Sequence, residues 1–69
     1  MNAILSTLSQ ATLAARQRTG DARIAVAVDH GRFRITRVDY LASGASVIEN
    51  VTEPLTFVAV LDALATLEN

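Results

Sequence analysis

The chain has no cysteine, and it has a single histidine among its 69 residues. Disulfide bridges and thiolate metal sites are therefore excluded, and one histidine would need several carboxylates beside it to bind zinc. We expect neither a metal nor a cofactor. Because a domain of this length buries only about 60% of the surface of its unfolded chain, its stability must come from apolar content or from a second subunit.

Aromatic residues and long apolar runs are also scarce. Aromatic residues make up 4% of the chain against an apolar total of 51%, so the expected core is aliphatic. No apolar run is long enough to cross a bilayer, and polar residues interrupt the segment from Met1 to Ala15 too often for a signal peptide. We expect no membrane association and a cytoplasmic location, and so short a chain suits a bacterial or phage source.

Lysine is absent, and the positive charge is confined to one half of the chain. Residues 1–38 hold all six arginines and two aspartates, whereas residues 39–69 hold five acids and no cation. The two halves therefore have net charges of +4 and −5. This asymmetry indicates either pairing between the halves or two opposed surfaces that partners could bind.

The spacing of apolar residues predicts one helix at each end of the chain. They recur every three or four positions over residues 3–18, which is typical of an amphipathic helix, and Asn2 is its expected N-cap. The segment Thr52–Pro54 is expected to open the last helix, since proline is tolerated in the first turn. Residues 55–67 continue that helix with few polar positions.

The last helix is more apolar than one sheet face requires. Val60 and Leu67 extend its apolar stripe, and we expect Val60, Leu64 and Leu67 to form a self-association surface. The alternative is that the first helix covers them.

Between the helices the alternation of side chains predicts a β-hairpin. Residues 22–29 and 32–41 read as two strands around a two-residue turn, His30–Gly31. The register that places Val28 opposite Phe33 keeps the apolar side chains of both strands on one face.

The second strand breaks this alternation after Ile35. Continued alternation would turn Arg37 inward and Val38 and Tyr40 outward. We expect a β-bulge near Thr36 and Arg37, because one extra residue would return Val38 and Tyr40 to the apolar face. The alternative is a sheet that is apolar on both faces at this end, which implies a partner.

A second turn is expected at Ala42–Gly44, followed by a third strand over residues 45–51 whose register stays open. The complete prediction is a two-layer α+β sandwich in the order α-β-β-β-α, with a three-stranded antiparallel sheet and both helices on one face. We expect residues 1–69 to form a single domain.

Four arginines are candidate partner-binding residues. In the predicted register Arg23, Arg32 and Arg34 project from the sheet face opposite the helices, and the bulge would bring Arg37 close to them. Such a patch could bind phosphates of a nucleic acid or an acidic protein surface. The alternative is a solvated face on which the arginines pair with acids such as Asp29.

The order of elements resembles that of double-stranded RNA-binding domains. In that family lysines at the start of the second helix bind phosphates, whereas the segment Thr52–Pro54 here carries only an acid. The resemblance is therefore one of topology alone. A sequence pI near 5.6 and a single tyrosine further disfavour nucleic acid as a partner.

His30 follows Asp29, and such a pair could transfer protons in catalysis. We expect the turn to leave His30 in solvent and Asp29 to point elsewhere, so no catalytic residue is predicted. The sequence instead favours a small, non-catalytic protein–protein interaction module, expected to be a homodimer, such as an accessory or inhibitor protein of a phage or mobile element. The alternative is a nucleic-acid or phosphate-binding protein that uses the arginine-bearing face.

Overall fold

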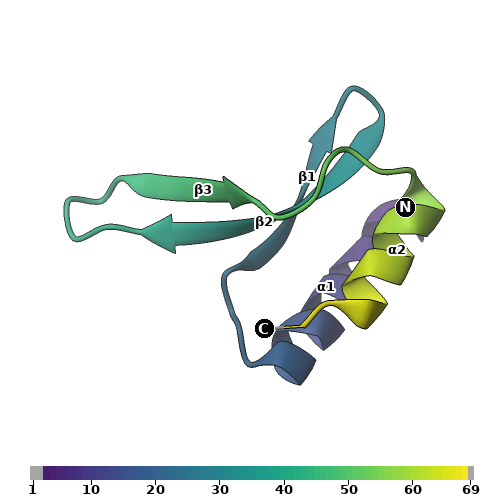
Figure 1. Cartoon of the computed structure of the whole chain (residues 1–69), viewed down its shortest axis with the longest axis horizontal. Helices are drawn as coiled ribbons and strands as arrows, with labels where there is room; N and C mark the ends of the chain where they lie inside the picture. Colours follow the sequence, from purple (N-terminus) through teal and green to yellow (C-terminus); the bar gives the residue numbers. More distant parts are fainter. Residues whose placement is uncertain (1–2, 69) are drawn as a thin grey trace.

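The computed structural model describes residues 3–68 as two helices and one three-stranded antiparallel sheet (Figure 1). The elements are α1 (Ala3–Thr19), β1 (Ile24–Asp29), β2 (Arg32–Tyr40), β3 (Ser46–Asn50) and α2 (Phe57–Thr66), with β2 in the middle of the sheet. This arrangement confirms the predicted α+β fold and its element order. Asn2, the expected N-cap of α1, lies outside the described residues. Within residues 3–68 no helix combines the length and apolarity needed to span a membrane.

The hairpin of β1 and β2 has the register predicted from the sequence. Val28 pairs with Phe33, and the pairing continues from Asp29 opposite Arg32 at the turn. The turn residues His30 and Gly31 have φ angles of 51° and 78°. Positive φ at both central positions is what a type I′ turn requires, and this turn matches the twist of the flanking strands.

The second hairpin continues the same alternation. Val38 pairs with Ile48 and Asp39 with Val47, and the pairs run without interruption along β2. The predicted bulge near Thr36 and Arg37 is therefore wrong. Arg37 can face inward without it, because acidic side chains meet it there. The register instead agrees with uninterrupted alternation, in which Val38 and Tyr40 face outward.

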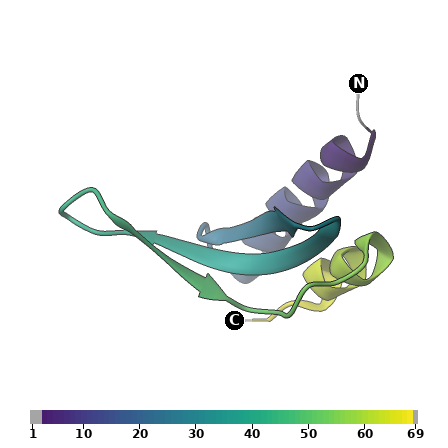
Figure 2. The ribbon, with the colours of Figure 1, turned by 90° about the horizontal axis from the view of Figure 1, so that it is seen from above.

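The two hairpins use different halves of β2. β1 pairs with the residues up to Arg37, whereas β3 pairs with those from Thr36 onward. Beyond Arg37, β2 pairs with β3 alone, so residues 38–50 project from the three-stranded part of the sheet and are called the arm below. Figure 2 shows the turn of the arm extending away from both helices. The sheet is thus covered by helices in one half only.

The core lies where both helices meet the covered half of the sheet. Among the described residues, six apolar side chains are buried: Leu8, Ala15, Ile24, Ile35, Val60 and Leu64. The ring of Phe33 meets that of Phe57 edge to face, with centroids 5.9 Å apart. The core is therefore mainly aliphatic, and it combines both helices with one face of β1 and β2.

The last helix begins later than predicted. Instead of opening at Thr52–Pro54, the chain stays extended, and Leu55 exchanges two backbone hydrogen bonds with Phe33, at 2.7 and 2.8 Å. Thr56 then caps α2, since its Oγ1 accepts a hydrogen bond from the backbone N–H of Ala59 at 3.3 Å. Pairing with β2 thus delays the helix until the capping threonine.

Two of the three residues predicted for self-association lie inside this core. Val60 is 0% exposed and Leu64 is 1% exposed, because α1 covers this side of α2. Leu67 is half-buried and packs against the same core. Arg18 adds a polar link between the helices by donating hydrogen bonds to the carbonyl oxygens of Leu64 and Leu67, at 2.6 and 2.8 Å. The prediction of a self-association surface on α2 is therefore wrong, because these residues make intramolecular contacts instead.

Two valines of α2 test this assignment. We predict that Val60→Ala lowers the free energy of unfolding by about 2 kcal/mol, through lost apolar contacts and a residual cavity. Val58, which is 75% exposed on the same helix, is the matched control, and Val58→Ala should change stability by less than about 0.5 kcal/mol. Urea denaturation followed by circular dichroism measures both. Equal losses at the two positions would contradict the burial of Val60.

Candidate functional site

The four candidate arginines do not form one patch. Arg32 and Arg34 alternate with inward-facing residues of β2 and so lie on the sheet face opposite the core, as predicted. Arg37 lies on the core side, because it pairs with Ile24 in the register. Arg23 sits just before β1 and binds acidic residues. The four arginines expected to share one face of the sheet therefore do not share it.

Asp21 binds two of these arginines. Its carboxylate accepts hydrogen bonds from Nε and Nη2 of Arg23 at 3.0 and 3.1 Å, and from Nε of Arg37 at 3.0 Å. The backbone N–H of Arg23 donates a further bond at 2.9 Å. The pairs extend to Asp39, 3.3 Å from Arg23, and to Glu49, 3.6 Å from Arg37. These pairs join residues of both halves of the chain, which is one of the two arrangements that the charge asymmetry suggested.

This geometry shifts the protonation of Asp21. The side-chain hydrogen bonds from Arg23 are the largest cause, followed by the backbone N–H of Arg23, and together they hold the pKa of Asp21 well below its usual range. The carboxylate of Asp21 in turn raises the pKa of Arg23. With only 8% of its side chain exposed, Asp21 is a structural anion whose acceptor positions are filled.

The remaining arginines are less constrained. Nη2 of Arg34 lies 3.7 Å from Asp29, which agrees with the ion pairing expected in the alternative, but the Arg34 side chain is only 27% exposed and therefore not fully solvated. Arg32 is exposed and makes no ion pair within residues 3–68. The other oxygen of Asp29 lies 2.5 Å from Nδ1 of His30, so the expectation that Asp29 points elsewhere is wrong. This pair sits at a turn where the His30 side chain is 97% exposed.

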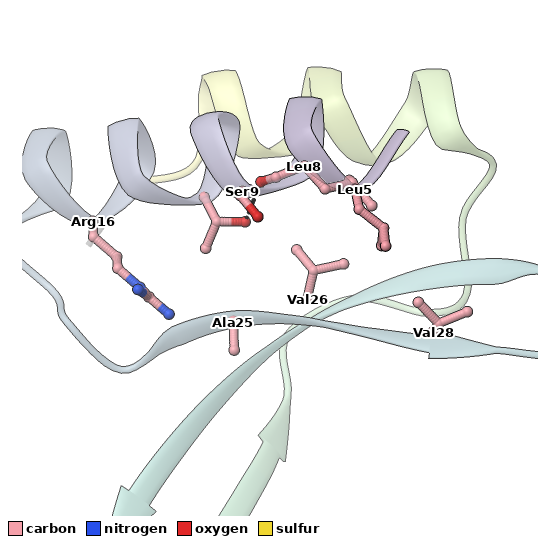
Figure 3. A pocket seen from close by; sticks show the side chains of 8 residues that line it. Leu5, Leu8, Ser9, Arg16, Ala25, Val26 and Val28 are labelled. Atoms are coloured by element: carbon pink, nitrogen blue, oxygen red, sulfur yellow. Dashed lines mark hydrogen bonds between the residues drawn. The ribbon is translucent and has the colours of Figure 1, made fainter. Parts of the chain in front are cut away.

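A groove of about 310 Å³ runs between α1 and β1. Figure 3 shows Leu5 and Leu8 reaching down from α1 toward Val26 and Val28 of β1, with Arg16 at one end. Nε of Arg16 donates a hydrogen bond to the carbonyl of Ile24 at 2.7 Å, so this side chain also holds α1 against β1. Arg16 is the only ionisable residue among those that line the groove. The groove can hold an apolar group, but its lining has no pair of groups that could transfer a proton.

The arm carries four exposed large apolar side chains, whereas β1 carries one, Val28, which is 62% exposed. Tyr40 is 81% exposed, Ile48 62%, and Leu41 and Val47 50% each. All of β3 is exposed. Ile48 pairs with Val38 on the outer face, whereas Val47 pairs with Asp39 on the core side. The arm therefore exposes apolar side chains on both faces, and within residues 3–68 no helix contacts β3.

Comparison with protein-family models, with curated proteins and with solved structures finds no match. The candidate surface is therefore defined by its own geometry.

The sequence prediction placed self-association on α2 and overlooked Leu41, Val47 and Ile48. The alternation of side chains along β2 was the signal that could have indicated this surface, because without a bulge Tyr40 must face away from the core. Asp21 was also overlooked. Its signal is its place directly after Gly20, whose φ of 71° ends α1 and turns the chain toward β1.

The lowered pKa of Asp21 predicts an acid-sensitive fold. The carboxyl group has a pKa near 3.9 in an unfolded chain, so it binds a proton more readily there than in the folded protein. Its contribution to stability should be fully present above about pH 4 and be lost as the pH falls toward its lower folded-state pKa. We predict that Asp21→Asn is less stable at neutral pH and loses less stability on acidification.

Urea titrations at neutral and acidic pH measure this difference. The matched control is Asp62→Asn, because Asp62 is exposed on α2 and makes no ion pair with the described residues. This control should keep the full acid sensitivity of the unmodified chain. An Asp21→Asn variant with unchanged acid sensitivity would show that Asp21 does not link folding to protonation.

Proposed function

We propose that this chain is a small, non-catalytic protein-interaction module that binds a protein through its arm. The observation that carries the proposal is the exposure of Tyr40 and Ile48 on a strand pair that no helix covers. Contiguous exposed apolar side chains are uncommon on isolated proteins and mark sites of interaction. Tyrosine is also among the residues enriched at protein interfaces.

The charges around the arm support a protein partner. Asp39 and Glu49, the acids of the arm, each lie beside an arginine of the same chain. A partner would therefore meet an apolar surface whose charges are already compensated, and it would not need to strip water from an unpaired ion. These properties suit burial of apolar area better than recognition of phosphate.

Photocrosslinking in the cells that make the chain tests this function. We predict that p-benzoylphenylalanine in place of Tyr40 forms a reproducible adduct with one protein, a second copy included, identified by mass spectrometry. The same group in place of Val58 is the control, since Val58 is comparably exposed but lies on α2. Introducing Ile48→Lys in the crosslinking chain should abolish the adduct.

The proposal has two contrary outcomes. Equal adducts at positions 40 and 58 would show that exposure alone causes crosslinking. The absence of any protein adduct at position 40 would show that the arm does not bind a protein in these cells.

A further inference from the structure

We propose that the partner of the arm is a second copy of this chain, whose β3 pairs antiparallel with β3 across a two-fold axis. The product is a continuous six-stranded sheet with the two arms at its centre. This inference rests on the proposed function, since it names the protein that the arm binds.

The backbone of β3 has the required free edge. The backbone N–H of Leu41 donates to the carbonyl of Ala45 at 2.8 Å, and that of Val51 donates to the carbonyl of Ile35 at 2.9 Å. Leu41–Ala45 and Ile35–Val51 are therefore hydrogen-bonded pairs of the β2–β3 ladder. Because bonded and non-bonded pairs alternate in an antiparallel ladder, the N–H and C=O groups of Ser46, Ile48 and Asn50 point away from β2. These three residues can therefore bond to another strand.

One register uses all of these groups. If Ile48 of one copy lies opposite Ile48 of the second copy, Ser46 of each copy lies opposite Asn50 of the other. Every outward N–H and C=O of β3 then has a partner, as expected for an isologous, two-fold contact. A shift along the strand would leave outward groups at its ends unpaired.

The side chains are also self-complementary in this register. Val38 and Ile48 are neighbours on the outer face of each arm, so the two copies form a continuous row of four β-branched residues across the axis. The Tyr40 side chains, 81% exposed in the single chain, flank this row. Cross-strand apolar pairs of this kind stabilise antiparallel sheets.

The two outer edges of the sheet differ in how they are protected. Edge strands are usually blocked by lysine, proline, a bulge or a covering element. β3 has none of these, and its one charge, Glu49, is paired with Arg37 at 3.6 Å. By contrast, α1 packs against β1, and Arg16 of α1 donates a hydrogen bond to the backbone carbonyl of Ile24. β3, which has no such contact with a helix within residues 3–68, is therefore the more open edge.

The size of the exposed surface agrees with a dimer. A compact monomer of this mass exposes about 4,200 Å², whereas this chain exposes 4678 Å². Its radius of gyration is 12.1 Å, against about 11 Å for a compact chain of this length. The excess of roughly 500 Å² approaches what each partner buries in a small stable interface, about 600 to 800 Å². A two-stranded ribbon is also only marginally stable in water, and a second copy supplies the missing strands.

Sedimentation velocity on the purified full chain is the first test. At micromolar concentration we expect twice the mass of the 7.4 kDa chain. Ile48→Lys places two like charges opposite each other and should yield a monomer, and so should Ile48→Asp. A mixture of the two variants should restore the dimer, which separates loss of pairing from loss of folding.

Introduced cysteines test the register, since the chain has no other thiol. Ile48→Cys should form a disulfide-linked dimer on oxidation, because directly opposite residues lie within bridging distance. Ser46→Cys alone and Asn50→Cys alone should stay unlinked, whereas a mixture of the two should form the mixed disulfide. These single variants are the matched controls for disulfides that form by random collision between chains.

The outcomes separate this inference from the proposed function. A monomer at micromolar concentration, or equal disulfide formation by all single variants, would overturn pairing through β3. If that monomer still forms an adduct with another protein at position 40 in cells, the arm binds a different partner and the proposed function stands. A monomer without any protein adduct at position 40 would overturn both.

Discussion

The carboxylate of Asp21 lies where α1 ends and where β1, β2 and β3 come together. It accepts hydrogen bonds from Arg23 and from Arg37, and it is almost fully covered. Without Asp21, the only acid beside the mostly covered Arg37 among the described residues would be the exposed Glu49, 3.6 Å away, and a charge that is covered but poorly paired is costly. Asp21 therefore allows Arg37 to face inward, and the rest of β2 follows from that direction.

Side chains alternate along a strand, so an inward Arg37 places Val38 and Tyr40 on the outer face. Ile48 joins them there because it pairs with Val38. Turning these apolar residues toward the core side would require Arg37 to face outward, and Asp21 would then be a covered carboxylate with fewer donors. The apolar outer surface of the arm is thus a geometric consequence of the ion pairs at residue 37.

The elements that depend on local signals were predictable from the sequence. The turn at His30–Gly31 and the pairing of Val28 with Phe33 follow from alternation and turn chemistry, and both are confirmed. The errors arose where residues distant in sequence decide the outcome. Alternation alone predicts a bulge at Arg37, because the spacing of residues does not reveal that its partner is Asp21, in the loop before β1. The apolar pattern predicts a helix at Leu55, because its bridge to Phe33 is a tertiary contact that spacing does not reveal.

The same separation explains why the candidate site was only partly predictable. Val60 looked like excess surface because the sequence could not show how closely α1 covers α2, whereas the exposure of Ile48 required the register of β3. Once Arg37 faces inward it also reaches Glu49, the one charged side chain of β3. The ion pairs that set the alternation of β2 therefore also neutralise the edge of β3. In the proposed dimer this links core packing to assembly, because the inward turn of Arg37 both exposes the apolar row and compensates the charge beside it.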